Sequence, residues 1–177
     1  IYKLASPEIG HYQLIKKIAL TKKPLIISTG MSDIEEIEKN FKFAKKNGVK
    51  KIAILYCVSN YPAKVSDFNM YNIDLLKKKF NCPIGFSDHT LGPCMSVAAV
   101  ANNACLIEKH FTLDKNQSDF RDHKLSANFD EMKYLVSSIR EIEQMLGAEV
   151  KDIQNSEKQI VNSLRRSIVA KKDLAIR

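Results

Sequence analysis

Residues 82–111 read CPIGFSDHTLGPCMSVAAVANNACLIEKHF, two short apolar runs that each end in a polar cluster. If the runs are strands, residues two apart point to the same side, so Ser87 shares a side with His89 and Glu108 with His110. If the strands are neighbours in one sheet, both pairs face one cavity at the same end of that sheet. Two imidazoles and a carboxylate that converge in this way suit a divalent metal.

A structural role for the histidines competes with this interpretation. A single histidine at a strand end is more often a hydrogen-bonded structural residue than a metal ligand. The matched pattern at two successive strand ends strengthens the metal interpretation without excluding the structural one.

Almost continuously apolar segments alternate with segments of helical periodicity along the chain. The apolar segments are residues 1–6, 23–30, 51–57, 83–87 and 104–111. This alternation is typical of a parallel sheet covered by helices. Polar clusters follow only the carboxyl ends of the apolar segments, where parallel α/β folds bind their ligands. Because the chain contains neither GxGxxG nor GxxxxGK[ST], a nucleotide-binding doubly wound fold is disfavoured.

The helix signals divide the rest of the chain. The expected helices are residues 12–20, a helix that starts at the capping box Ser32-Asp33-Ile34-Glu35 and ends at Gly48, and residues 70–80, 95–102 and 130–146. Residues 114–126 are expected to form a polar loop. In the tail, residues 155–177, we expect one short helix and a β-like run over 167–170.

Five strands are too few for a closed barrel, which needs eight strands and about 250 residues. An open arc of five strands leaves two bare edges. Since the 177-residue chain also starts at once with an apolar segment, we expect it to be part of a longer chain that has further strands before Ile1. We expect residues 1–154 to form the barrel part and residues 155–177 to form a last helix and a linker.

The formal net charge of +8 comes largely from clustered lysines and arginines. No aromatic residues are interleaved with them as a base-stacking platform requires, so nucleic acid is not an expected partner. A solvated basic surface that partly serves an anionic substrate is the preferred interpretation. No apolar run approaches the length of a membrane span and no signal peptide opens the sequence, so no membrane partner is expected.

The four cysteines form no CxxC pair. They are Cys57, Cys82, Cys94 and Cys105. Three of them lie in or beside apolar runs, so we expect reduced core cysteines and a cytoplasmic location.

Seven separated motifs resemble those of the N-acetylneuraminate (sialic acid) synthase family, which includes the legionaminic and pseudaminic acid synthases. The motifs are YKLAS (2–6), KPLIISTGM (23–31), CVSNYP (57–62), GFSDHTLG (85–92), EKHFTLD (108–114), DHKLS (122–126) and RRSIVA (165–170). They follow the family's order with similar spacings over almost the whole chain.

The resemblance implies an eight-stranded α/β (TIM) barrel followed by a small antifreeze-like domain. It places this chain at strands four to eight plus the start of the linker. The first three strands and the antifreeze-like domain, which supply further active-site groups in the family, are absent from the sequence. The resemblance therefore implies a homodimer for the full-length protein and no activity for this chain by itself.

The implied reaction condenses phosphoenolpyruvate with an N-acetylated hexose, such as N-acetylmannosamine, to a nine-carbon sugar acid and phosphate. By resemblance His89 and His110 hold a divalent metal, Mn²⁺ or Mg²⁺, that polarises the aldehyde. Glu108 matches an acidic residue beside the developing oxocarbenium. A partner role toward Lys109, or an orienting role near the metal, is the alternative for Glu108.

The remaining site residues also come from the resemblance. Asp122 matches an acidic residue that binds sugar hydroxyls and assists proton transfer, although Phe120-Arg121 replaces the family's usual Gly-Pro before it. Tyr61 matches a tyrosine near the sugar. The residues expected to bind phosphoenolpyruvate are Lys23, Ser28, Ser59 and Ser87.

Three other functions stay open on the sequence. A metal-dependent aldolase on the same barrel would form the carbon–carbon bond without releasing phosphate. A non-catalytic module would bind only an anion. A basic nucleic-acid binder would show a steep dependence of affinity on salt.

Overall fold

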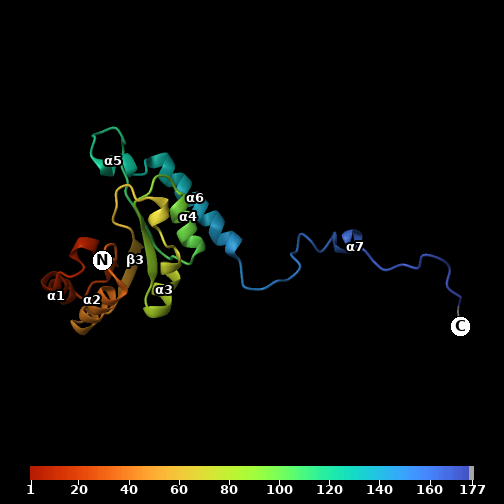
Figure 1. Ribbon diagram of the computed structural model, residues 1–177, viewed down its shortest axis with the longest axis horizontal. Helices are drawn as coiled ribbons and strands as arrows, with labels where there is room; N and C mark the ends of the chain where they lie inside the picture. The colour runs from red at the N-terminus through yellow and green to blue at the C-terminus, as the bar shows by residue number, and fades with distance from the viewer. Residues whose placement is uncertain (176–177) are drawn as a thin grey trace. The chain divides into compact units, whose positions relative to one another are not determined.

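Five parallel strands form one curled sheet in the order of the sequence (Figure 1). The computed structural model describes residues 1–175. The strands are β1 (Tyr2–Leu4), β2 (Leu25–Ser28), β3 (Ile52–Cys57), β4 (Ile84–Asp88) and β5 (Ile107–Lys109). This half-barrel confirms the expected parallel α/β fold and its five strands.

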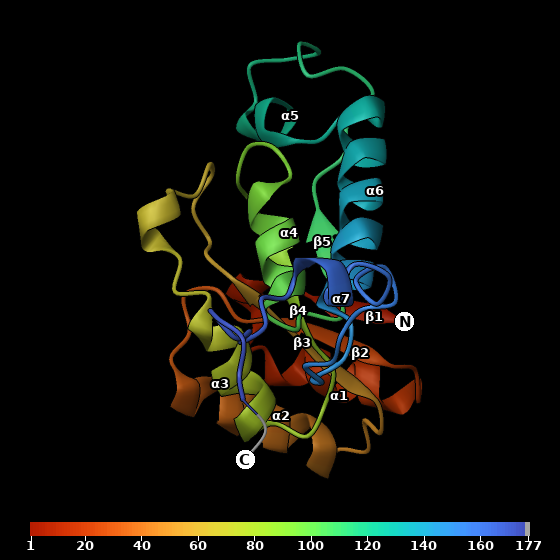
Figure 2. The ribbon, with the colours of Figure 1, turned by 90° about the vertical axis from the view of Figure 1, so that its right-hand side faces the viewer.

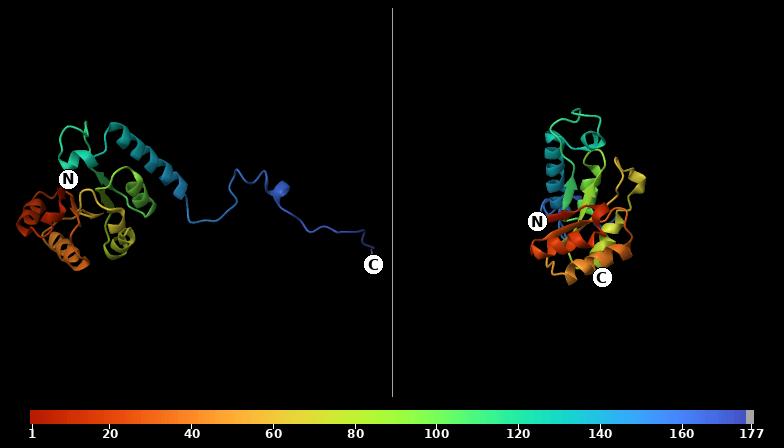
Figure 3. Two further views of the ribbon diagram at one scale, coloured as in Figure 1. Left: turned by 45° about the horizontal axis from the view of Figure 1, so that its top comes forward. Right: turned by 90° about the vertical axis from the view of Figure 1, so that its left-hand side faces the viewer.

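Helices follow the strands and run in an arc around the outside of the curled sheet (Figure 2, Figure 3). The long ones are α1 (Tyr12–Leu20), α2 (Ile34–Lys46), α3 (Tyr71–Lys79), α4 (Cys94–Ala101) and α6 (Phe129–Leu146). The short ones are η1 (Ser6–Glu8), η2 (Val65–Asp67), α5 (Arg121–Leu125) and α7 (Val161–Leu164). The expected helices over 12–20, 70–80, 95–102 and 130–146 are confirmed to within one residue at each end.

The chain divides into two compact units, Ile1–Leu146 and a second one that begins at Gly147. The sheet and all the long helices belong to the first unit. The only regular element of the second unit within the described residues is α7. None of the described helices has the length and apolarity that crossing a membrane requires.

Strand residues alternate between the two faces of the sheet, as the pleat of a β-strand requires. On the face toward the helices, Leu4, Ile27, Ile54 and Phe86 are at most 2% exposed and form one core with apolar residues of α1 to α4. Residues of the opposite parity, such as Ser87, face the inside of the curl. Burial of the first set holds the helices on the sheet and leaves the second set free to line a site.

The start of α2 differs from the expected capping box. Asp33, not Ser32, is the N-cap, and its Oδ1 accepts a hydrogen bond of 2.8 Å from the backbone N–H of Glu36. The predicted end of this helix at Gly48 is confirmed. Gly48 follows the helix with φ of +100°, a conformation that glycine adopts without strain.

Four other expectations were wrong in part. The fifth strand covers only Ile107–Lys109 of the expected 104–111, and the polar loop over 114–126 contains α5. No strand forms over residues 167–170, which are exposed. Only Cys57 is a fully buried cysteine, whereas Cys94 and Cys105 are exposed. Cys105 lies just before the outermost strand β5, where an apolar run is covered on fewer sides, and Cys94 is the first residue of α4.

Gly85 marks the closest approach of β4 to the backbone before β5. A Cβ atom at this position would overlap the carbonyl oxygen of Leu106 and come within 2.7 Å of Leu55 Cδ2. We therefore expect Gly85→Ala to lower the free energy of unfolding by about 1–3 kcal/mol in urea denaturation. Gly10→Ala is the matched control, since nothing lies within 4 Å of a Cβ there. Equal stability of the two variants would contradict this packing account.

Candidate functional site

A pocket of about 300 Å³ lies at the carboxyl ends of the strands. All five strands or the turns that follow them contribute to its wall. The predicted site residues that line it are Ser28, Ser59, Tyr61, Ser87, His89, Glu108 and His110. We call this cavity the strand-end pocket.

His89 and His110 lie next to each other in the lining of this pocket, with ring centroids 5.4 Å apart and ring planes at 70°. His89 is 5% exposed, and its Nδ1 lies 2.9 Å from the carbonyl oxygen of Val58. A carbonyl oxygen only accepts, so Nδ1 carries the proton and Nε2 keeps its lone pair. Burial lowers the pKa of His89, which keeps the ring neutral at pH 7.

The two imidazoles fit a shared metal ion. Metal–nitrogen bonds of about 2.1 Å fit between rings at the observed centroid distance, and the hydrogen bond from Nδ1 of His89 orients its ring in the manner typical of ligating histidines. The Glu108 carboxylate lines the same pocket as both rings, but among residues 1–175 no three His, Cys, Asp or Glu side chains form a group that could hold a metal. A metal bound here would therefore have two protein ligands, His89 and His110, and open positions for other oxygen atoms.

Glu108 is held by groups inside the pocket. Its Oε1 accepts a hydrogen bond of 2.7 Å from Ser87 Oγ and lies 3.2 Å from Lys3 Nζ. The direct register of Ser87 with Glu108 across β4 and β5 brings these two side chains together. The alternative in which Glu108 pairs with Lys109 was wrong, because Lys109 lies on the opposite face of the sheet.

Lys109 and Asp88 form a buried ion pair on the helix side of the sheet. Their side chains are 3% and 0% exposed, and Lys109 Nζ lies 3.0 Å from Asp88 Oδ2. Asp88 also accepts hydrogen bonds from Thr90 N, Thr90 Oγ1 and Ser96 Oγ, and Lys109 donates to the carbonyl of Thr90. These contacts fix the turn after β4 and therefore the backbone position of His89.

The floor of the strand-end pocket is polar and closely packed. Ser28 Oγ is buried and has no hydrogen-bond partner among the described residues, so it is available to bond a ligand. Ser6 Oγ accepts a hydrogen bond of 3.0 Å from the backbone N–H of Gly30. A Cβ atom on Gly30 would overlap Ser59 Oγ and approach Cys57 Sγ to 2.8 Å, so only glycine fits here.

Two predicted site residues do not line this pocket. Asp122 lies just outside it, with Oδ2 4.0 Å from His110 Nδ1 and with Oδ1 buried without a hydrogen bond. Lys23 precedes the amino end of β2, at the opposite end of the strand from Ser28, and its Nζ lies 5.7 Å from the centre of the Tyr2 ring. The structure therefore brings Asp122 close to the other residues but not Lys23.

Seven lining residues were not predicted as site residues. Three of them have charged or hydroxyl side chains, Lys3, Ser6 and Arg121. Strand parity gives a signal for Lys3, since it is the only charged residue in the apolar run that starts the chain and Leu4 next to it faces the core. Ser6 ends the same run. Nothing in the sequence indicates that Arg121 reaches the pocket. Its position depends on the path of the long loop between β5 and α5.

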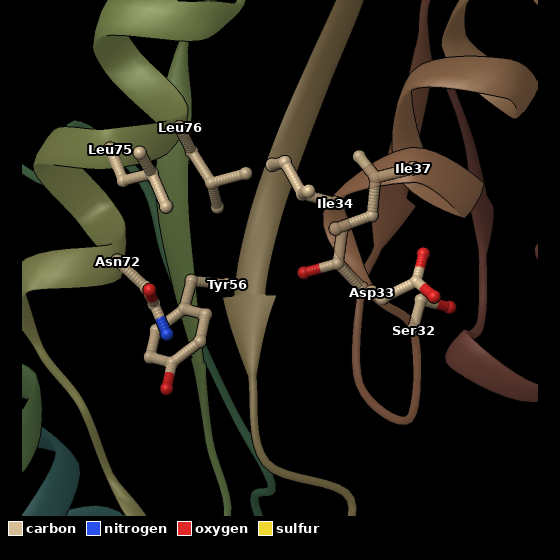
Figure 4. A pocket seen from close by; sticks show the side chains of 9 residues that line it. Ser32, Asp33, Ile34, Ile37, Tyr56, Asn72, Leu75 and Leu76 are labelled. Atoms are coloured by element: carbon tan, nitrogen blue, oxygen red, sulfur yellow. The ribbon is translucent and has the colours of Figure 1, made fainter.

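A second pocket, of about 210 Å³, lies on the helix side between α2 and α3 (Figure 4). Ile34, Ile37, Leu75 and Leu76 form its apolar wall. Its one carboxylate, that of Asp33, already caps α2. With no histidine, cysteine or cation in its lining, this second pocket has far less chemistry than the strand-end pocket.

Comparisons with known proteins find relatives that match almost the whole of this chain. A family model described as the NeuB family matches residues 1–151. An uncharacterized protein of Methanocaldococcus jannaschii is 47% identical over 173 residues, which are 98% of this chain and 51% of that protein. The N,N'-diacetyllegionaminic acid synthase of Campylobacter jejuni is 44% identical over 176 residues, 98% of this chain and 52% of the synthase.

A solved structure gives the same result. The crystal structure of N-acetylneuraminic acid (sialic acid) synthetase from Leptospira borgpetersenii in complex with citrate superposes with a TM-score of 0.81 at 36% identity. The match covers 93% of this chain and 58% of the synthetase chain. The chain thus spans about half the length of the curated relatives it matches.

Proposed function

Because this chain belongs to the NeuB family, we propose that the protein it represents condenses phosphoenolpyruvate with an N-acetylated hexose. The products would be a nine-carbon sugar acid and phosphate. One observation carries the proposal: His89, His110, Glu108 and Lys3 meet in a single pocket at the carboxyl ends of the strands. The synthase names of the relatives support the sugar-acid product.

The reaction needs the methylene carbon of phosphoenolpyruvate to attack the aldehyde carbon of the sugar. The new carbon–carbon bond leaves positive charge on the enol carbon, water adds there, and the carbon–oxygen bond to phosphate then breaks. A divalent metal, Mn²⁺ or Mg²⁺, held by His89 and His110 would supply Lewis acidity for the aldehyde oxygen.

The chain's own residues serve the other requirements. The Glu108 carboxylate, oriented by the Ser87 hydroxyl at 2.7 Å, would stabilise the positive charge that develops on the enol carbon. Lys3 and the unpartnered hydroxyl of Ser28 offer donors to the carboxylate and phosphate of phosphoenolpyruvate. Ser59 lies beside them in the lining.

The sugar end of the pocket lies toward Tyr61 and Asp122. The Tyr61 ring packs on His89 with centroids 4.2 Å apart and forms a wall against which a sugar can bind. Oδ1 of Asp122 is buried and accepts no hydrogen bond from the described residues, so it is an acceptor for a sugar hydroxyl, and the same carboxylate is placed for proton transfer near His110. Homodimer formation, the cytoplasmic location and inactivity of this stretch by itself stay predictions.

The test measures phosphate release from phosphoenolpyruvate by the whole protein with N-acetylmannosamine and Mn²⁺, together with the mass of the sugar product. Removing the Glu108 charge takes away electrostatic stabilisation of the transition state, so Glu108→Gln should lower kcat about 10²- to 10³-fold. Glu143→Gln is the control, since Glu143 is exposed and pairs only with Arg140. A new carbon–carbon bond without phosphate release would assign an aldolase instead, and unchanged kcat in Glu108→Gln would refute the role of this carboxylate.

A further inference from the structure

Arg121 forms the outer layer of an aromatic stack over the strand-end pocket. Its Cζ lies 4.7 Å from the centre of the Tyr61 ring, and Tyr61 in turn packs on His89 with an interplanar angle of 32°. Stacking on an aromatic face holds the guanidinium plane in one orientation. The fork of N–H donors is therefore prearranged at the rim of the pocket.

The Arg121 side chain makes no hydrogen bond within residues 1–175. It forms an ion pair with Asp122, whose Oδ1 lies 3.7 Å from Nε, a distance too long for a hydrogen bond. The Arg121 side chain is 62% exposed, so a ligand can reach it. A guanidinium offers five N–H donors in a geometry that matches phosphate and carboxylate oxygens in pairs.

Lys3, the other cation of the pocket, has a different position and a different ion-pair partner. Lys3 belongs to β1 and Arg121 follows β5, the two outer strands of the sheet, so the cations enter the pocket from opposite edges. Lys3 Nζ lies 3.2 Å from Glu108 Oε1, whereas the guanidinium of Arg121 has only the longer contact of 3.7 Å with Asp122 Oδ1 and makes no side-chain hydrogen bond among residues 1–175. Its N–H donors at the rim of the pocket can therefore bind a second anionic group.

We propose that Arg121 is a substrate-binding residue that takes a phosphate or carboxylate group at the rim of the strand-end pocket. The identity of the substrate rests on the proposed function, but the binding itself does not require turnover. The anion can belong to phosphoenolpyruvate or to a charged acceptor sugar. Arg121 would in the second case determine which acceptors the protein accepts.

Calorimetric titration of the whole protein separates these sources. The probes are phosphoenolpyruvate, N-acetylmannosamine 6-phosphate and uncharged N-acetylmannosamine. Loss of charge-assisted hydrogen bonds in Arg121→Gln should weaken binding of at least one of the two anions about ten-fold or more. Affinity for the uncharged sugar should change less than about two-fold. Arg121→Lys should recover part of the affinity, because lysine keeps the charge but lacks the fork.

Lys124→Gln is the matched control. Lys124 belongs to the same helix, is also 62% exposed, pairs with Asp119 and does not line the pocket. A selective loss for phosphoenolpyruvate supports the inference and assigns the anion to that substrate, and a selective loss for the sugar phosphate assigns it to the acceptor.

The inference is overturned if Arg121→Gln leaves both anions unaffected, if Lys124→Gln has the same effect, or if the uncharged sugar loses as much affinity as the anions. The last result would mean that Arg121 only holds Tyr61 in place. Failure of the wild-type protein to bind phosphoenolpyruvate at all is a different result, because it refutes the proposed function as well.

Discussion

His89→Ala and His110→Ala are each expected to weaken Mn²⁺ binding by more than about 100-fold, since loss of even an orienting partner of a metal ligand costs 10- to 100-fold. The physical reason is the geometry of the two rings, which lie in the same pocket at a centroid distance of 5.4 Å, short enough for both to bind one ion. Metal binding requires a neutral ring, and burial lowers the pKa of His89, so protons compete weakly at pH 7. Titration of the metal-free protein with MnCl₂ measures the effect.

His11→Ala is the control for this experiment. His11 is exposed, caps α1 through a hydrogen bond from the Leu14 N–H to its Nδ1, and lies outside the lining of the strand-end pocket. We expect this variant to bind Mn²⁺ like the wild type. Tight binding that survives in either pocket variant would show that the two histidines are structural, which is the alternative that the sequence left open.

Lys109→Met should lower the free energy of unfolding by about 3–5 kcal/mol, the typical cost of leaving one partner of a buried ion pair uncompensated. Asp88 would then be left at 0% exposure without its cationic partner, with Thr90 and Ser96 as its hydrogen-bond donors. The double variant Asp88→Asn/Lys109→Met contains neither charge and should lose less than the sum of the two single variants. Urea denaturation of the three variants gives these values.

Arg140→Met provides the exposed counterpart of Lys109→Met. Arg140 pairs with Glu143 at 2.7 Å, but both side chains are about half exposed or more. Such pairs contribute little, so the variant should lose about 0.5 kcal/mol or less. If Lys109→Met were no more destabilising than Arg140→Met, burial would not be what makes the Asp88–Lys109 pair important.

The residue types and their order predicted most of the sheet. Continuous apolar runs could be recognised because the central strands are buried along most of their length, and the polar residues that end these runs marked the site. The prediction was weakest at the edges: the fifth strand is shorter than its apolar run, and Cys105 beside it is exposed. A run of apolar residues shows that a segment tends to form a buried strand. How far the segment is actually buried depends on neighbours that are distant in sequence.

The candidate site was also predicted in part, and its unpredicted part depends on residues that are distant in sequence. Strand parity correctly placed Ser87 with His89 and Glu108 with His110 in one pocket. It did not reveal which charged partners those residues have, so Lys3 beside Glu108 was missed. The lysine that was expected to bind phosphoenolpyruvate, Lys23, does not line the pocket. The loop before α5 has no regular periodicity, and the arrival of Arg121 over Tyr61 could not be predicted from it.

By itself, then, the sequence determined the parallel α/β fold, the end of the sheet that carries the site, and the side on which each strand residue lies. These features follow from local rules, because the pleat alternates side chains with a period of two and apolar runs seek burial. Only the tertiary structure decided that Glu108 meets Lys3, that Asp88 and Lys109 pair behind the pocket, and that Val58 fixes the proton on His89. Each of these contacts joins residues from different strands or turns, and its distance depends on the register and curl of the whole sheet.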